Sequence, residues 1–473
     1  MVDAPATAVE RVGVVVVGTR CAGSATAATL AKAGHDVVVL DAAALPSDTL
    51  STHLLWPGGL AELQRLDALA AVEALGAPRL TRAYAQGAGY GVGSGFPPVD
   101  GIDYAMCVRR TGLDAALLRT AVAAGADVRP RCRVTSVVWD GNRCAGVRYL
   151  DAAGKTVELR AALVVGADGR RSTIAREVGA ERPFLTVPSG RDCFFAYWRD
   201  TADAPRHIAA QWRVGADLGT AFPCDDGLVL SLVQPPAVSD HGRGPGAAER
   251  RYTEALARIP DLTSRLSDCE RVSRVRSATG ISSYFRRSAG PGWALPGDSG
   301  HFKDPVTAQG IRDALHYGRT LAESVVEALD DPHALDAALS QWECRRVIEC
   351  REIFHWTNRL ARGENMRPLE IELYRAAVGD PELAEITVGI FSRTHRPAEL
   401  YTPTRALGLA VRALRHQRAH LPAVLTDMAR EIRDSTRERR TTRTTLRGSA
   451  PLAAPPSTPR STLTIAGPGE HHA

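Results

Sequence analysis

The sequence predicts an α/β protein in which an antiparallel β-sheet is inserted into a parallel-sheet domain and helices follow at the C-terminal end. Two apolar, β-branched runs enclose a helical pattern near the start, short alternating segments follow residue 182, and helical periodicity prevails after Gly310. Continuous apolar runs are typical of strands buried on both faces of a parallel sheet, whereas alternation is typical of antiparallel strands with one solvated face.

The first unit begins with the run Val12–Val17, which stops at Gly18. Residues from about 22 to 33 are small and helix-permissive, and Gly34 suits the end of a helix. The run His35–Asp41 is a second buried strand. Together these segments form a βαβ unit, which predicts a Rossmann-type domain.

Later segments complete this order. A third buried strand, Ala161–Ala167, ends in Asp168-Gly169. The alternating segments are Cys193–Arg199, His207–Val214 and Gly227–Gln234, and the helical patterns are Ile311–Leu329 and about Leu335–Leu360. The segment Gly87–Gly95 is rich in glycine, but we expect only a loop or strand connection there, because no strand and helix flank it.

A length of 473 residues suits two or three domains. We expect a nucleotide-binding domain formed by residues 1–181 and 286–330, with a substrate domain of antiparallel sheet at 182–285 inserted between them. Residues 331–430 form a C-terminal helical region. Residues 431–473 are rich in Thr, Arg, Pro and Ser, so we expect a disordered tail.

The composition argues against several classes of protein. The net charge of +5 is inflated by an Arg-rich stretch between Arg430 and Arg460, so we expect no nucleic-acid partner. Nine cysteines without a C-x-x-C pair favour a reducing, cytoplasmic location and no metal site. The run Val12–Val17 is far shorter than the roughly 20 residues that span a bilayer, so we expect no membrane span.

The first strand–helix turn carries a glycine fingerprint. Gly18 and Gly23 stand at the outer positions of G-x-G-x-x-G, with Ala22 before the second, while Arg20 replaces the middle glycine. Asp41 follows at the distance where an acid binds a ribose hydroxyl. A helix N-terminus favours a diphosphate, which the Arg20 guanidinium could also contact. The alternative is a βαβ unit without a ligand.

Two later motifs and a weaker third make the prediction specific. The segment from Leu163 to Arg176 resembles the DG motif of the p-hydroxybenzoate hydroxylase-like superfamily (group A flavoprotein monooxygenases), and the segment from Trp293 to Gly310 resembles its GD motif and flavin loop. The matching positions are Asp168, Gly169, Ser172, Arg176, Gly297, Asp298, His301, Pro305, Gln309 and Gly310, with Arg110 in a weaker Arg-x-x-Leu match. The segment Pro46–His53 and the pair Lys303-Asp304 resemble an actinobacterial-type subgroup.

The resemblance implies a Rossmann-type FAD-binding domain. Asp298 is expected to bind a ribityl hydroxyl, Pro305 to wall one flavin face, and the N–H groups near Gln309 and Gly310 to face the flavin N1–C2 carbonyl. Asp168 and Arg176 would hold the DG loop beside FAD and the nicotinamide. Arg110 would contact flavin phosphate or ribitol, or else be a surface residue. Ala308, Arg312 and Ala42 depart from the family pattern.

Two histidines are candidate catalytic residues in this sequence. His53 and His301 are the candidates, because histidine transfers protons near neutral pH. His53 could equally be structural, and His301 is more typical of a residue that caps or packs beside the GD loop. Phe195, Tyr197 and Trp198 belong to one expected strand. One face of that strand should line the substrate pocket, or else all three are ordinary sheet core.

The resemblance implies a monooxygenase that uses NAD(P)H and O₂ and oxygenates a small aromatic or polyketide-like substrate through a flavin C4a-hydroperoxide. No second glycine fingerprint is visible, so NAD(P)H would bind transiently in the substrate cleft. Three alternatives remain: a reductase of the geranylgeranyl-reductase type, a flavin halogenase, although the Trp-x-Trp-x-Ile-Pro segment is absent, and a non-catalytic flavin-binding protein. The oligomeric state is left open.

Overall fold

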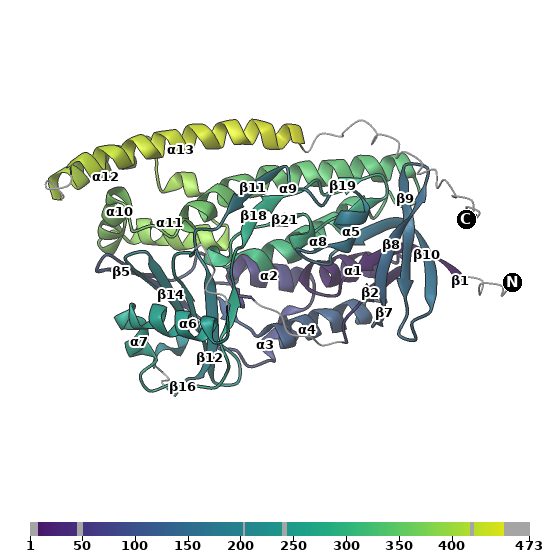
Figure 1. Cartoon of the computed structure of the whole chain (residues 1–473), viewed down its shortest axis with the longest axis horizontal. Coiled ribbons are helices and arrows are strands. Elements are labelled where there is room, and N and C mark those ends of the chain that lie inside the picture. Colours follow the sequence, from purple (N-terminus) through teal and green to yellow (C-terminus); the bar gives the residue numbers. More distant parts are fainter. Residues whose placement is uncertain (1–7, 45–50, 202–203, 239–243, 417–420, 449–473) are drawn as a thin grey trace, which may run out of the picture.

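The computed structural model describes residues 8–44, 51–201, 204–238, 244–416 and 421–448. Its architecture is the predicted mixed α/β fold: a parallel sheet with helices, a second sheet beside it, and helices at the C-terminal end (Figure 1). The expected loop Pro46–His53 lies largely outside the described residues.

The first sheet has the strand order β19-β20-β10-β1-β2-β7. Its members are β1 (Ala8–Val17), β2 (Val37–Asp41), β7 (Asp127–Pro130), β10 (Thr156–Gly166), β19 (Ala289–Gly290) and β20 (Trp293–Ala294). Strand β1 pairs in parallel with β10 and β2, so the three predicted strands lie side by side with their carboxyl ends at one edge. The antiparallel strands β8 (Arg133–Asp140) and β9 (Arg143–Leu150) extend from β10.

Helices cover this sheet because its strands are apolar on both faces. Helix α1 (Cys21–Lys32) packs against α8 (Gly310–Val325) and α4 (Arg110–Ala123). One core cluster joins Val14 and Val16 of β1 to Leu30 of α1 and Leu321 of α8. The shorter helices of this part are α2 (Pro57–Arg65), α3 (Leu69–Glu73) and α5 (Thr173–Glu177).

The second sheet is larger than predicted. Its order is β16-β12-β15-β14-β13-β4-β5, with β17 beside β12. The strands are β12 (Cys193–Arg199), β13 (Ile208–Val214), β14 (Asp217–Pro223), β15 (Leu228–Gln234), β16 (Glu270–Arg271), β17 (Arg276–Ala278), β4 (Arg82–Gly87) and β5 (Tyr90–Ser94). Helices α6 (Ala247–Ala257) and α7 (Pro260–Arg265) pack on one of its faces.

Strands β4 and β5 correct the expectation for the glycine-rich segment. This segment is a β-hairpin, and β4 pairs in parallel with β13, whose sequence lies more than a hundred residues later. The sheet therefore draws strands from before residue 182. Glycines suit this hairpin because an added Cβ at Gly87 or Gly91 would meet the side chains of Met366 or Tyr84 within 3.0 Å.

Two small sheets join the parts. Strand β3 (Leu54–Leu55) pairs with β6 (Met106–Cys107), and β18 (Ser282–Phe285) lies between β11 (Leu185–Pro188) and β21 (His301–Phe302). These short ladders tie the segments on either side of the second sheet to the first domain.

The C-terminal region consists of α9 (Pro332–Leu360), α10 (Pro368–Val378), α11 (Pro381–Ser392), α12 (Pro403–His416) and α13 (Leu421–Gly448). The Asp331 carboxylate caps α9 by accepting from the His333 and Ala334 amides. The prediction of disorder from residue 431 is wrong as far as Gly448, because α13 continues to that residue; residues 449–473 lie outside the described part.

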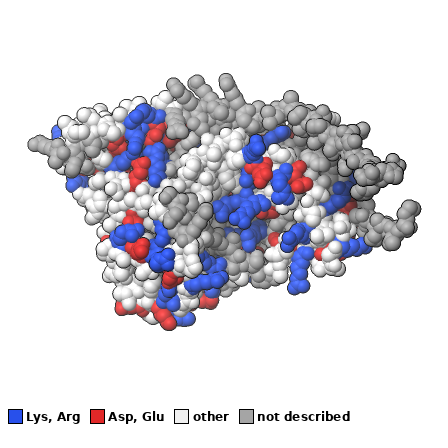
Figure 2. All heavy atoms as spheres, in the orientation of Figure 1, with Lys and Arg blue, Asp and Glu red and all other residues white. Residues whose placement is uncertain are grey.

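The surface charge and the cysteines give no sign of a specialised class of protein. On the face in Figure 2, basic and acidic side chains are interspersed rather than separated into fields of one sign. All nine cysteines are free thiols. Within the described residues, no helix combines the length and apolarity needed to cross a bilayer.

Candidate functional site

The glycine fingerprint forms a tight turn at the carboxyl end of β1. Gly18 has φ +102°, and an added Cβ would lie 2.5 Å from the Ala167 carbonyl oxygen. A Cβ on Gly23 would lie 1.8 Å from the Gly18 carbonyl oxygen. Helix α1 therefore starts directly against the strand ends, and the N–H groups of its first turn lie there with a positive partial charge.

Asp41 holds the glycine turn from the neighbouring strand. Its carboxylate accepts hydrogen bonds from the Thr19 amide at 2.9 Å, the Thr19 hydroxyl at 2.6 Å and the Ala43 amide at 2.8 Å. The predicted acid thus stands at the expected end of β2, only partly buried. Its contact with a ribose stays a prediction.

Asp114 is a residue that the sequence reasoning missed. Its carboxylate accepts from Arg110 at 2.9 and 3.0 Å, lies 3.9 Å from the Arg20 guanidinium, and contacts the Cys21 thiol. Burial alone would lower the pKa of Arg110, but nearby Cys21, Asp114 and Asp298 raise it overall. Arg110 is therefore a buried cation beside the glycine turn, not a surface residue. The signal was available in the sequence: Asp114 stands four residues after Arg110 on one helix.

The DG motif orders its own turn. Asp168 accepts from the Ser172 hydroxyl at 2.5 Å and from the Thr173 and Ile174 amides at 2.6 and 3.2 Å, while Gly169 has φ +78°. Burial raises the pKa of Asp168, and these hydrogen bonds oppose that shift. Arg176 lies on the surface, 3.5 Å from Glu177. Asp168 thus holds the loop in shape, whereas contact of either residue with FAD or nicotinamide stays a prediction.

The GD motif lies directly against α1. Gly297 has φ +65°, and an added Cβ would lie 2.9 Å from the Ala22 Cβ, so both positions require small residues. Among the described residues, no donor forms a hydrogen bond with the Asp298 carboxylate. Burial raises the pKa of Asp298, while the positive charges of Arg170, Arg110 and Lys303 lower it. Asp298 is therefore an acceptor placed between cations at the predicted cofactor site.

The flavin loop is a short 3₁₀ turn, Pro305–Thr307, that leads into α8. Asp304 caps it by accepting from the Val306 amide at 2.9 Å, and burial raises the pKa of Asp304 to about 6. Pro305 is half-buried and Gly310 is exposed, so both can be reached from outside the loop. The side-chain amide of Gln309 donates to the backbone carbonyls of Ile390 and Phe391 in α11. The Gln309 side chain therefore anchors the loop to α11.

Ala308, one departure from the family pattern, keeps a backbone conformation typical of glycine. It has φ +50°, a left-handed conformation that glycine adopts without strain and alanine does not. The loop keeps the conformation that a glycine would allow. Trp56 helps to hold it, because its indole N–H donates to the Thr307 carbonyl at 3.1 Å. Ala308 also belongs to the apolar cluster that contains Phe195.

His53 joins the two sheets at this loop. It is fully buried, has φ +62°, and its Nδ1 donates to the Ser51 carbonyl at 2.7 Å. Its Nε2 then accepts from the Tyr197 hydroxyl at 2.5 Å. Phe195 packs edge-on against the His53 ring at 5.6 Å. Phe195 and Tyr197 thus share the face of β12 that meets His53, while Trp198 points to the opposite side and donates to Tyr252. Phe195 belongs to a buried apolar cluster, and a substrate pocket on this face stays a prediction.

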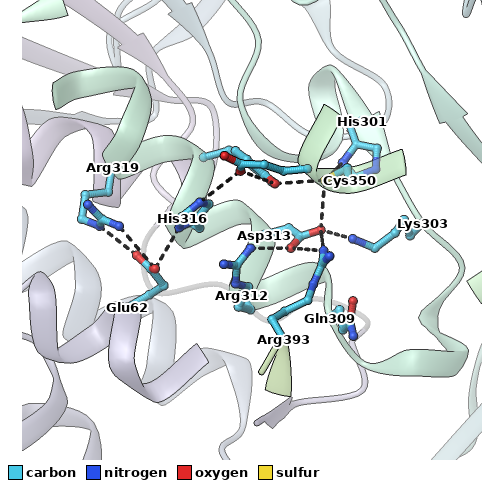
Figure 3. Close-up of polar contacts among 12 residues, drawn as sticks. Glu62, His301, Lys303, Gln309, Arg312, Asp313, His316, Arg319, Cys350 and Arg393 are labelled. Carbon is cyan, nitrogen blue, oxygen red and sulfur yellow. Dashed lines mark hydrogen bonds and ion pairs between the residues drawn. The ribbon is translucent and has the colours of Figure 1, made fainter. Parts of the chain in front are cut away.

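His301, the second candidate, lies in the core behind the GD motif. Its ring stacks on Phe285 at a centroid distance of 4.3 Å, and burial together with nearby Lys303 lowers the pKa of His301 well below its usual range. It is a neutral, packed histidine beside the buried Lys303–Asp313 ion pair, toward which Arg393 also points (Figure 3).

His301, Asp313 and Cys350 bring potential metal-ligand atoms within 4.8 Å of one another. Lys303, Arg312 and Arg393 surround the same carboxylate. These positive charges would repel a cation, and Asp313 is already neutralised by them. The cluster therefore does not fit a metal site.

The predicted residues converge on one edge of the first sheet. The glycine turn follows β1, the Ser299 hydroxyl donates to the last residue of β10, and the GD turn contacts α8. Gly18, Asp41, Arg110, Asp168, Asp298, Pro305 and Gly310 thus follow or adjoin the same set of strand ends and helix N-termini. In a doubly wound sheet this edge is where ligands bind.

Comparison with known proteins agrees with this arrangement. A family profile described as an FAD binding domain matches residues 11–348. The chain is 30% identical over 342 residues to the menaquinone reductase of Mycolicibacterium smegmatis, covering 66% of this chain and 76% of that one. It is 26% identical over 324 residues to a tryptophan 2-halogenase of Chondromyces crocatus, covering 66% and 60%.

Solved structures show the same fold at lower identity. The structure of PqsL from Pseudomonas aeruginosa, described as a probable FAD-dependent monooxygenase, superposes with a TM-score of 0.60 at 20% identity, covering 80% of this chain and 99% of that one.

Proposed function

Because this chain belongs to the FAD binding domain family and is an FAD-dependent oxidoreductase, we propose that it is a monooxygenase that uses NAD(P)H and O₂ to oxygenate a small aromatic or polyketide-like substrate. Bound FAD would supply the redox chemistry, accepting hydride and activating oxygen. The residues of the chain position the cofactor, exclude water and handle the substrate proton.

The described residues fit FAD along the edge of the first sheet. The first turn of α1 and Arg20 suit the diphosphate, and Asp41 suits the ribose. The Asp298 carboxylate, without a hydrogen-bond donor among the described residues, suits a ribityl hydroxyl. The accessible Pro305 and the amide of Gly310 at the start of α8 suit the ring, where a helix N-terminus stabilises negative charge.

The observation that carries the proposal is the hydrogen bond from Tyr197 to His53. In the neutral His53 ring, with Nδ1–H given to Ser51, Nε2 is the acceptor, so the pair is arranged to accept a proton. A hydroxyl that donates to a neutral imidazole becomes a stronger acceptor itself. A phenolic substrate that donates to Tyr197 would thereby gain electron density in its ring, which favours attack on an electrophilic oxygen.

The packing around this pair supports the same reaction. His53 and Phe195 are buried, and Trp56 ties their neighbourhood to the flavin loop. Exclusion of water protects a reactive oxygen species from breakdown before it meets the substrate.

A second candidate is an isoprenoid-type reductase. Its specific support is the 30% identity to a menaquinone reductase over 342 residues. That reaction requires a group that donates a proton to a carbon atom after hydride transfer, and it requires no oxygen. The His53–Tyr197 pair would then have to donate a proton instead of accepting one.

One experiment separates the two. NADPH oxidation and oxygen uptake are measured with a panel of phenolic and polyketide-like compounds, and in parallel with a menaquinone under anaerobic conditions. A monooxygenase shows substrate-dependent oxygen uptake and an oxygenated product. Anaerobic saturation of a side-chain double bond of the menaquinone, without oxygen uptake on any phenol, would replace the proposal with the reductase.

The variant Tyr197→Phe sharpens this test. It removes the hydroxyl and keeps the ring, so we expect kcat on a phenolic substrate to fall about 100-fold with little change in flavin reduction by NADPH. Tyr84→Phe, on β4 of the same sheet, is the matched control and should leave kcat unchanged. Equal kcat in wild type and Tyr197→Phe would remove the proton-transfer role.

A further inference from the structure

Helix α13 has an acidic inner face that is fastened to the rest of the chain. Three carboxylates at spacings of seven and four residues pair with arginines of α9 and the segment after it: Asp427 with Arg367 at 3.1 Å, Asp434 with Arg362 at 2.8 Å, and Glu438 with Arg359 at 2.7 Å. Val424, fully buried, lies on the same side. These contacts fix which side of the helix faces the protein.

The outer face of the same helix carries an apolar stripe. Leu421, Leu425 and Ile432 are 46%, 54% and 67% exposed, at spacings of four and seven residues that place them on one stripe. Helix α12 repeats the pattern: Leu409 and Ala413 are buried, while Leu407 is 64% exposed and Val411 39%. A surface helix normally turns its apolar stripe to the core, so these helices carry a second one toward solvent.

This concentration is unusual within the molecule. Of the 13 large apolar side chains exposed in the described part of the chain, five lie on α12 and α13. Both helices run along one edge of the molecule (Figure 1). Single exposed apolar residues need no explanation, but an exposed group of them indicates an interaction surface.

The polar residues beside the stripes are basic. Arg412, Arg415 and Arg433 are exposed, and α12 contains no Asp or Glu. The described carboxylates of α13 that form ion pairs are turned inward. The outer surface thus combines apolar side chains with positive charge, which is the composition of helices that lie in a membrane interface.

We propose that the outer face of α12 and α13 binds the surface of a bilayer that contains anionic lipid. Such a surface accepts leucine and isoleucine side chains at the level of the acyl boundary and pairs arginine with lipid phosphate. A second copy of this chain fits less well, because an isologous contact would set the arginines of both copies against each other. The proposal goes beyond the proposed function and does not depend on it.

The test is co-sedimentation of the full chain with vesicles. With vesicles of phosphatidylcholine and phosphatidylglycerol we expect binding that weakens as salt rises, and at least about tenfold weaker binding to phosphatidylcholine alone. The double variant Leu425→Glu with Ile432→Glu should bind the anionic vesicles at least about tenfold more weakly than wild type. Arg412→Gln with Arg415→Gln should weaken binding less and reduce its salt dependence.

The control is a double change at exposed valines elsewhere, Val122→Glu with Val272→Glu, which are 52% and 41% exposed. It should bind vesicles like wild type. The proposal is overturned if wild type does not bind anionic vesicles, or if the leucine and isoleucine changes leave binding intact. A second result would also overturn it: light scattering finds a dimer in wild type and a monomer in the leucine and isoleucine variant, and neither the dimer nor the monomer binds vesicles.

Discussion

The two ends of the candidate cofactor site reach the same kind of backbone conformation with different residues. At the nucleotide end, positive φ angles fall on Gly18, Gly169 and Gly297. At the ring end they fall on Ala308 and His53, with φ +50° and +62°. Glycine adopts such angles at no steric cost, whereas a side chain raises the energy by about 1–2 kcal/mol per residue.

This difference indicates different tasks. At Gly18 the backbone comes close to the Ala167 carbonyl, and only the absence of a Cβ allows that. An added Cβ on Gly297 would meet the Ala22 side chain, whereas Gly169 has open space and needs glycine only for its positive φ. At the ring end there is room for a side chain. The strained, positive φ angles lie at His53, which contacts Tyr197, and at Ala308, which belongs to the apolar cluster. Strain of this kind gathers at functional sites because the surrounding packing imposes it.

The largest effect is expected for Gly23→Ala. Its Cβ would lie 1.8 Å from the Gly18 carbonyl oxygen, so α1 would have to move away from β1. We expect a loss of at least about 4 kcal/mol of unfolding free energy and no FAD binding. Gly408→Ala is the control, because an added Cβ there meets no atom within 4 Å. Urea unfolding and flavin absorbance measure both variants, and a folded, FAD-binding Gly23→Ala would contradict the close approach.

Asp114→Asn tests the buried charge at the nucleotide end. It leaves Arg110 without a carboxylate, which we expect to cost about 3 kcal/mol and to weaken FAD binding. Asp127→Asn removes a carboxylate from a surface pair whose Asp127 side chain is 52% exposed, so its effect should stay below about 0.5 kcal/mol. Calorimetric unfolding compares the two variants. Equal effects would show that the buried Arg110–Asp114 pair contributes no more to stability than an exposed ion pair.

Asp304 gives the ring end a pH dependence. Because burial raises the pKa of Asp304 to about 6, from an unfolded value near 4, the folded state holds its proton more tightly. Stability from this group is therefore present below about pH 4 and lost as pH rises through about 6, by roughly 3 kcal/mol. Asp304→Asn should flatten urea unfolding free energies between pH 4 and 7. Asp380→Asn, the same change at the exposed cap of α11, should leave that slope as it is.

The smallest effect is expected for Ala308→Gly. Relief of the positive φ should stabilise the chain by about 0.5–1 kcal/mol. Ala88→Gly relieves a similar angle, φ +51°, in the β4–β5 turn and serves as control. If strain positions the ring end, only Ala308→Gly lowers turnover. Unchanged turnover in both variants would mean that the strain has no function.

Much of the first domain could be predicted because its signals are local. The apolar run Val12–Val17 lies within β1, and the predicted helix at 22–33 differs from α1 by one residue at each end. Strand β12 matches its predicted bounds. Glycines at turns, apolar runs and caps all act over a few residues, so single segments carry the information.

What was missed depends on contacts between distant segments. Strand β4 pairs with β13, which lies far away in the sequence. The glycine-rich hairpin lacks the alternation of apolar and polar residues that would predict a strand there. The seven residues of β14 are buried on both sides, which also removes alternation. Asp114 acts because α4 brings it beside Arg20, and α13 is held by Asp434 and Glu438 within a stretch whose composition suggests disorder.

The central claim is that the edge formed by the glycine turn, Asp298 and the flavin loop holds one FAD. The direct measurement is the visible spectrum of the purified full-length chain after incubation with excess FAD and removal of free flavin. We predict flavin absorbance at close to one equivalent per chain, and its loss in Gly23→Ala but not in Gly408→Ala. A chain that stays colourless would contradict the account.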